Sequence, residues 1–158
     1  MLWEDATMCV LLDRLDLFTR KKEVLEKYNQ YRDALNRNGV TVSDVIAKKM
    51  KERPIAWMRN EYPYDVDNTR HYLIWSTYQL SNEKIKEIAT RHAQGRKFIC
   101  FVNPEYLRSV KNIWHAHVII TNETNIQAHN PSTTLSNQHS YTNSYYLPQK
   151  SQHMPTTY

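Results

Sequence analysis

Glycine and cysteine are both scarce in this sequence, and each shortage excludes or disfavours a class of protein. Only two of the 158 residues are glycine, Gly39 and Gly95. Loops that cradle the phosphates of nucleotides or dinucleotides need several glycines close together, so such loops are excluded. A sandwich or barrel with many tight turns is disfavoured for the same reason. The two cysteines, Cys9 and Cys100, favour a reducing compartment over a disulfide scaffold.

Long apolar runs are lacking as well. No stretch approaches the roughly 20 apolar residues that a membrane span needs. The first residues, MLWEDATMCVLLDRLDLF, are rich in leucine, but acidic residues interrupt them and no basic segment precedes them. We therefore expect neither a signal peptide nor contact with a membrane, and we predict a soluble, cytoplasmic protein.

Positive charge is in moderate excess and is not gathered in one block. There are 21 Lys and Arg residues against 16 Asp and Glu, which gives a formal net charge of +5. The basic runs TRKK (19–22) and KKMKER (48–53) are typical of solvated helix faces. Because the aromatic and basic repeats of RNA-binding motifs are missing, only weak attraction to nucleic acid is expected.

Composition changes sharply near residue 122. Residues 122–158 are rich in Ser, Thr, Asn, Gln, His and Tyr, and they contain one acid and one lysine. Such a segment cannot bury enough apolar surface to offset the entropy of ordering the chain, so we predict a disordered polar tail. Residues 1–121 are expected to form a single α+β domain.

The periodicity of apolar residues changes from helical to strand-like along the domain. Helical spacing predicts helices within residues 5–18, 21–39, 43–53 and 82–95. Runs rich in aromatic and β-branched residues predict strands within residues 70–80, 97–102 and 113–120.

This order of elements predicts an α+β fold with a helical N-terminal half and a small sheet of three to four strands covered by helices. The helix between the first two strands suits a parallel crossover between neighbouring strands. An antiparallel arrangement is the alternative.

The last predicted strand places two histidines side by side. In KNIWHAHVII (111–120), His115 and His117 share one face with Ile119, and the residues between them point to the opposite face. We interpret that opposite face as core. Two imidazoles so close together cannot both be protonated cheaply, so at least one should be neutral near pH 7.

Other polar residues lie where strands begin or end, which is a common way to assemble a site from distant parts of a chain. We predict a cleft whose candidate catalytic residues are His71, His115 and His117. The candidate ligand-binding residues are Arg70, Asn103, Asn60, Tyr64, Ser109 and Arg108.

Four interpretations of the histidines stay open. The rings can be structural and hydrogen-bonded to the backbone or to tyrosine hydroxyls. They can act as acid and base, with Arg70 or Arg108 holding an anion. They can bind a metal, but an HxH pair without a carboxylate motif is a weak signal, so neither a metal nor another cofactor is expected. Finally, they can bind a small polar ligand between Tyr and Trp walls without chemistry.

Several short blocks carry a resemblance to a known family. NEYPY (60–64), RHYLIWS (70–76), FVNPEYLRSV (101–110) and WHAHVII (114–120) resemble, in order and spacing, the N-acetylglucosamine-induced protein family, a mostly fungal domain of unknown function. LFTRKKEVLEKYNQYRDAL (17–35) is similar to a helix of that family. The matched positions are Asn60, Pro63, Tyr64, His71, Trp75, Asn103, Ser109, His115 and His117.

This chain departs from that family at the edge of the expected cleft. Tyr31 and Tyr62 stand where the family more often has Trp, and the segment between Met50 and Asn60 is shorter than usual. These departures concern the rim of the cleft and not the histidines. The resemblance implies no substrate.

The function predicted from these residues is acid–base hydrolysis or transfer on a small molecule that carries a phosphate, such as a sugar phosphate. One histidine would act as the base, another as the acid or electrostatic partner, and an arginine would hold the anion. The alternative is a non-catalytic module that binds a ligand, or an adaptor that uses its charged helical half as a contact surface.

Overall fold

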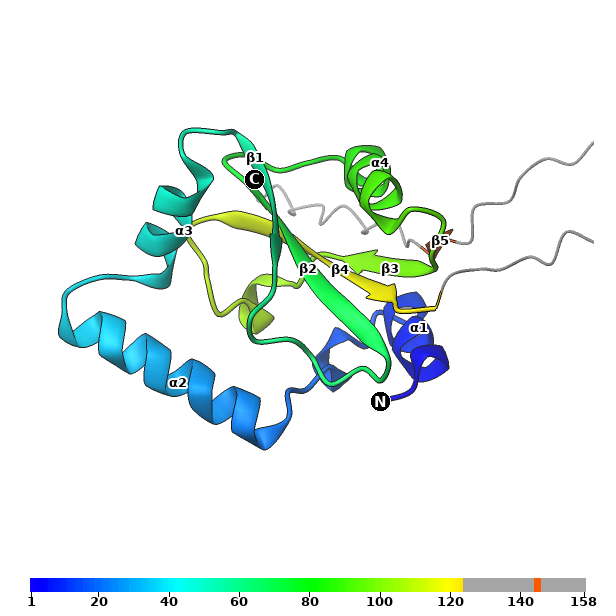
Figure 1. Ribbon diagram of the computed structural model, residues 1–158, viewed down its shortest axis with the longest axis horizontal. Helices are drawn as coiled ribbons and strands as arrows, with labels where there is room; N and C mark the ends of the chain where they lie inside the picture. Colours follow the sequence, from blue (N-terminus) through cyan, green and yellow to red (C-terminus); the bar gives the residue numbers. More distant parts are fainter. Residues whose placement is uncertain (124–143, 146–158) are drawn as a thin grey trace, which may run out of the picture.

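The computed structural model describes residues 1–123 and 144–145, which form an α+β fold (Figure 1). The N-terminal part holds α1 (Trp3–Leu11), the 3₁₀ turn η1 (Leu15–Leu17), α2 (Lys22–Arg37) and α3 (Val42–Met50). The rest comprises β1 (Ile55–Arg59), β2 (Thr69–Ser76), α4 (Asn82–Ala93), β3 (Phe98–Phe101), η2 (Glu105–Leu107), β4 (Trp114–Thr121) and β5 (Ser144–Tyr145). The predicted α+β fold with a helical N-terminal half is confirmed. Most of the predicted disordered tail lies outside the described residues.

The strands form one sheet in the order β1-β2-β4-β3-β5. The pairs β1–β2, β2–β4 and β4–β3 are antiparallel, and the two-residue β5 pairs with β3 in parallel. Of the two arrangements left open, direct parallel pairing of β2 with β3 is wrong because β4 lies between them, and β1 to β4 pair antiparallel. Residues 116–120 of β4 are fully buried, so this strand takes the centre of the sheet, where both of its faces are covered. Sequence reasoning also missed β1.

Helices cover both faces of the sheet (Figure 1). On one face, α4 packs Ile85, Ile88 and Ala89 against a cluster that includes Val118 and Ile120. This confirms the predicted core face of β4. On the other face, α1 covers the β3 side, and α3 contributes Met50 to a separate cluster around Ala56, Trp75 and Val110. The three histidines lie on this second face, between its two apolar clusters.

The helices α2 and α3 form a wall over the second face of the sheet, and the sequence of each helix helps to explain how it lies there. A capping box begins α3: the Asp44 backbone N–H donates to Thr41 Oγ1 (3.1 Å), and the Thr41 backbone N–H donates to Asp44 Oδ2 (2.7 Å). In contrast, Tyr28 is the single buried side chain of α2. An amphipathic helix that buries so little leaves room between itself and the sheet, and the candidate site lies in that space.

Within the part of the chain that the structure describes, every helix is too short or too polar to cross a membrane.

Ile119→Ala tests the central position of β4. The Ile119 side chain is 0% exposed and packs with Ile99 and Phe101, so the substitution should lower the free energy of unfolding by about 2–5 kcal/mol. Leu17→Ala is the control, because Leu17 is 44% exposed, and it should cost less than about 1 kcal/mol. Urea denaturation measures both. Equal losses would contradict this assignment of the core.

Candidate functional site

The three histidines converge on the second face of the sheet. Antiparallel pairing sets Leu73 opposite His117 and Trp75 opposite His115, so His71 lies diagonally across from His117. His71 Nε2 is 2.9 Å from His117 Nδ1, and the ring centroids of His115 and His117 are 5.3 Å apart. All three side chains are at most 5% exposed. Burial this deep favours hydrogen-bond partners inside the protein for their ring nitrogens.

One side of this network fixes the proton position on His71. The backbone N–H of Tyr64 donates to His71 Nδ1 (3.1 Å), and Asn60 Nδ2 lies 3.3 Å from the same nitrogen. Asn60 is itself oriented, since its Oδ1 accepts from the Tyr62 backbone N–H (3.0 Å). A backbone amide can only donate, so His71 Nδ1 is an acceptor and a neutral ring carries its proton on Nε2. His71 Nε2–H therefore donates to His117 Nδ1.

The same logic continues through His117 to Asn103. Because His117 Nδ1 accepts, its proton lies on Nε2, which is 3.1 Å from the Asn103 amide nitrogen. The two ends of an amide have the same shape, so the network decides which end faces His117. Turning the amide over lets its oxygen accept from both His117 Nε2–H and the Tyr64 hydroxyl, which is 2.8 Å away. The other amide atom is buried without a partner among the described residues.

Electrostatics keeps these rings neutral. Burial, followed by the charges of Arg20 and His115, lowers the pKa of His71 to about 3. Burial and the neighbouring His71 also hold the pKa of His117 well below its usual value. Since every ring nitrogen of His71 and His117 already has a partner, these two histidines orient one another and hold the face of β2 to β4.

His115 differs from the other two because one of its nitrogens is free. Its Nδ1 lies 3.1 Å from the Ile113 carbonyl oxygen, which can only accept, so the neutral ring carries its proton there. Nε2 has no hydrogen-bond partner among the described residues. Burial lowers the pKa of His115 as well, so Nε2 presents a lone pair at neutral pH. The ring packs on Trp75, with centroids 4.6 Å apart.

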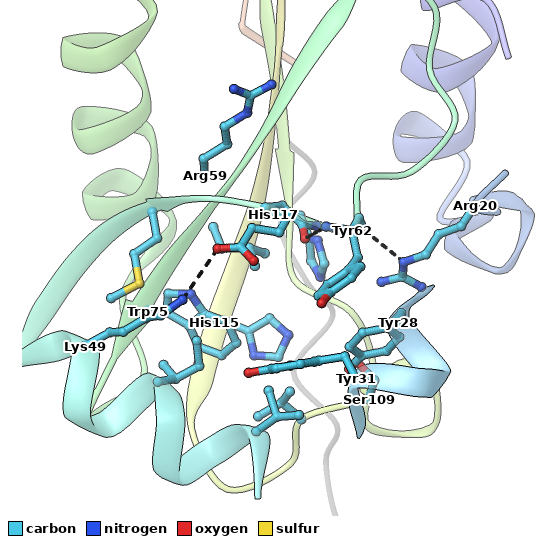
Figure 2. Close-up of a pocket in the computed structure, with 17 residues that line it drawn as sticks. Arg20, Tyr28, Tyr31, Lys49, Arg59, Tyr62, Trp75, Ser109, His115 and His117 are labelled. Atoms are coloured by element: carbon cyan, nitrogen blue, oxygen red, sulfur yellow. Dashed lines mark hydrogen bonds and ion pairs between the residues drawn. The ribbon is translucent and has the colours of Figure 1, made fainter. Parts of the chain in front are cut away.

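A cavity of about 390 Å³ opens beside His115, between the sheet and the wall of α2 and α3 (Figure 2). This volume suits a small molecule. Its lining residues are Arg20, Tyr28, Tyr31, Val42, Ile46, Lys49, Met58, Arg59, Asn60, Glu61, Tyr62, Leu73, Trp75, Ser109, Val110, His115 and His117.

Three cations and one carboxylate lie along this lining. Lys49 and Glu61 pair with each other across the rim at 3.5 Å. Arg59 is exposed, and its side chain extends away from the cavity (Figure 2). Arg20 is half-buried, and its Nε donates to the Tyr62 carbonyl oxygen at 2.9 Å. After the Lys49–Glu61 pair is set aside, the remaining charge of the cavity is positive.

The structure brings together most of the predicted site residues, in two layers. Asn60, Ser109, His115 and His117 line the cavity. His71, Tyr64 and Asn103 lie behind it in the hydrogen-bonded network, and Arg108 Nε donates to the Asn103 backbone carbonyl at 2.7 Å.

The prediction that Arg70 lies in the cleft is wrong. It precedes His71 on β2, so it points to the opposite face of the sheet, where it is exposed.

Sequence reasoning missed the residues that α2 and the segment before it contribute. Tyr28, Tyr31 and Arg20 face the cavity, but along the sequence the two tyrosines continue the apolar stripe of a helix. The departures at Tyr31 and Tyr62, where the matched family more often has Trp, were the signal that pointed to this rim. Tyr28 is placed by its hydroxyl, which donates to Ser109 Oγ at 2.9 Å.

No group of three His, Cys, Asp or Glu residues within the described chain is arranged to hold a metal ion. In particular, the nitrogens that His71 and His117 present to each other are joined by a hydrogen bond.

Comparison with known sequences identifies the family. A sequence model with the description "Protein of unknown function (DUF3605)" matches residues 2–94, which is more than half of the chain. The chain belongs to this family. The matched region of the DUF3605 protein includes Asn60, Tyr64 and His71 and ends before β3 and β4. The finer name, N-acetylglucosamine-induced protein family, stays a prediction.

A solved structure supports the fold. The chain is similar to the crystal structure of a protein called HTC1, with a TM-score of 0.59 and 20% sequence identity, over 76% of this chain and 84% of that one. At this identity the likeness shows the fold alone. No curated protein matches the chain.

Acid titration tests the neutral network. His71 and His117 have folded-state pKa values below the unfolded value of about 6.5, so the unfolded chain binds more protons as the pH falls from 6.5 toward 3. Between pH 7 and 5.5, each of them should therefore remove about 1 kcal/mol from the free energy of unfolding. Urea denaturation across this range measures the slope. His71→Gln should flatten it, and an unchanged slope in that variant would contradict the burial of neutral His71.

Proposed function

We propose that this DUF3605 protein binds a small molecule in the cavity and that His115 contacts the ligand at its floor. The observation that carries the proposal is the free Nε2 of His115. It is the one ring nitrogen among His71, His115 and His117 without a partner in the described chain, and it belongs to a residue that lines the cavity. A neutral ring nitrogen with an open lone pair at a cavity wall favours a ligand that donates a hydrogen bond to it.

His71 and His117 support this site from behind. Their hydrogen bond fixes the facing sides of β2 and β4, and the ring of His117 lies 5.3 Å from that of His115. Arg20 supplies positive charge at the cavity edge, which favours an anionic group such as a phosphate. These contacts support a site in which the ligand meets His115, Arg20, Asn60 and Ser109 rather than all three histidines equally.

Acid–base hydrolysis or transfer on a phosphate-bearing molecule is the second candidate function. Its support is the lowered pKa of His115, because a histidine that stays neutral at pH 7 can accept a proton from water or from a substrate hydroxyl. His115 would be the general base, and Arg20 would stabilise charge on the phosphoryl oxygens. The adaptor alternative has no comparable support, since the polar groups of this site face inward.

A matched pair of ring substitutions tests ligand binding. His115→Phe keeps an aromatic ring against Trp75 and removes Nε2, whereas His92→Phe makes the same change at a histidine stacked on Trp57 on the opposite face (4.1 Å). Ligand-observed NMR with a panel of sugar phosphates, aryl phosphates and small carboxylates measures binding. At least one compound should bind to the wild type and to His92→Phe, and about tenfold or more weakly to His115→Phe, as expected for a lost buried hydrogen bond. Equal binding to all three proteins would overturn the proposal.

Turnover of p-nitrophenyl phosphate tests the second candidate function. If His115 is the general base, the rate should fall as the pH drops through the pKa of His115, which burial holds below the usual value for histidine. Loss of the rate in His115→Phe, with the rate of His92→Phe unchanged, would support catalysis. A rate that both variants retain would contradict the role of His115 as base.

A further inference from the structure

We propose that the ligand of this cavity is an amphipathic anion, with its acidic group on Arg20 and an apolar or aromatic body against the wall of α3. This inference rests on the proposed function, because it names the class of ligand for the same cavity. It also departs from the sugar phosphate predicted from the sequence.

Arg20 is prepared to hold an acidic group. Its Nε is held by the Tyr62 carbonyl oxygen (2.9 Å), and its guanidinium carbon lies 5.2 Å and 5.0 Å from the ring centroids of Tyr28 and Tyr64. Contacts on the ring faces and on Nε fix the plane of the guanidinium and leave its two Nη groups without partners among the described residues. Those two groups present the fork that binds a carboxylate or phosphate in a bidentate manner.

Arg20 also lacks a counter-ion. None of the ion pairs formed by the described residues includes it, although it is half-buried. A partly buried cation without an anion is unfavourable, so an acidic ligand would remove that penalty. Among the other cations of the lining, Lys49 is already paired with Glu61, and Arg59 extends away from the cavity (Figure 2). The acidic group of the ligand is therefore assigned to the Arg20 side.

The opposite wall is suited to an apolar body. Val42 and Ile46 on α3 and Met58 and Leu73 on the sheet are half-buried in the Met50 cluster, and all four line the cavity. Hydroxyl groups of a sugar would lose water against these side chains without gaining hydrogen bonds, which is unfavourable. An aryl or alkyl group would instead gain from covering the same surface.

Several polar groups on the cavity floor are already hydrogen-bonded to protein groups. Ser109 Oγ already accepts the Tyr28 hydroxyl, and Asn60 is held by the Tyr62 backbone N–H and His71. His115 Nε2 is an open acceptor on the floor, and the hydroxyls of Tyr31 and Tyr62 on the lining also have no hydrogen-bond partner among the described residues. The ligand should therefore carry one acidic group and at most a few further polar groups, one of which donates to His115.

Four probes separate the two halves of the ligand. Phenyl phosphate has both the acid and the ring, phenol has the ring alone, inorganic phosphate has the acid alone, and glucose 6-phosphate replaces the ring with a polyol. Isothermal titration calorimetry on the full chain at low salt measures their affinities. Phenyl phosphate should bind about tenfold or more tightly than each of the other three, because it alone uses both walls.

Two variants and a control test which residues contact the acidic end and the apolar end of the ligand. Arg20→Gln should weaken phenyl phosphate about tenfold and leave phenol unchanged, because it removes the charge from the acidic end. Ile46→Asn should weaken phenyl phosphate and leave inorganic phosphate unchanged. Arg70→Gln is the charge-matched control, since Arg70 is exposed on the opposite face of the sheet, and its affinities should stay within about twofold of wild type. Thermal melting checks that each variant folds.

The outcomes distinguish this inference from the proposed function. Tighter binding of glucose 6-phosphate than of phenyl phosphate, with dependence on His115, would overturn the amphipathic ligand and leave the cavity as a binding site. Phenyl phosphate that binds Arg20→Gln and Arg70→Gln equally would overturn the assignment of the acid to Arg20. Failure of all four probes, and of the wider panel, to bind would overturn both.

Discussion

The hydrogen bond between His71 Nε2 and His117 Nδ1 is the contact on which the candidate site depends. Two imidazoles can be joined in this way only if one donates and the other accepts, and the backbone N–H of Tyr64 decides which does which. The order then runs from Tyr64 through His71 and His117 to Asn103, with each neutral ring protonated on Nε2. Protonation of either ring would place two hydrogen-bond donors against one another on this face of the sheet. Because the pKa values of both rings are lowered, both rings are neutral near pH 7.

His115 does not belong to this network, and for that reason its Nε2 is open to the neighbouring cavity. His71 and His117 use their ring nitrogens on each other and on the backbone and amides around them, so in the proposed site they support His115. His115 bonds to the Ile113 carbonyl through Nδ1 and keeps Nε2 open. In the proposed site, a small ligand between the sheet and the α2–α3 wall would meet one neutral base on the floor and, at the edge, Arg20, a cation without an ion-pair partner among the described residues.

The sequence predicted the elements better than their arrangement. Helical stripes and aromatic or β-branched runs indicated the helices and three of the strands, because side-chain periodicity is a local property. The pairing of β4 between β2 and β3 depends on which strand is buried on both faces, and local patterns do not decide that. The short strand β1 was missed, since its five residues, IAWMR, hold only one β-branched and one aromatic side chain.

The part of the candidate site that lies on the strands was predictable, because side chains along a strand alternate between the two faces of the sheet. His115 and His117 were placed on one face, and His71 joined them because β2 and β4 pair antiparallel. Arg70 was assigned to the wrong side, although the same alternation separates it from His71. Arg20 and the tyrosines of α2 were not predictable, because their place depends on how a helix with one buried side chain lies over the sheet.

Nitrogen-15 NMR of the histidine rings at pH 7 tests the central claim most directly. Long-range correlations report which ring nitrogen carries the proton in each residue. The predicted result is a neutral His71 and a neutral His117, both protonated on Nε2, and a neutral His115 protonated on Nδ1. An imidazolium at any of the three positions, or a proton on Nδ1 of His71, would contradict the network and the free Nε2 on which the ligand site depends.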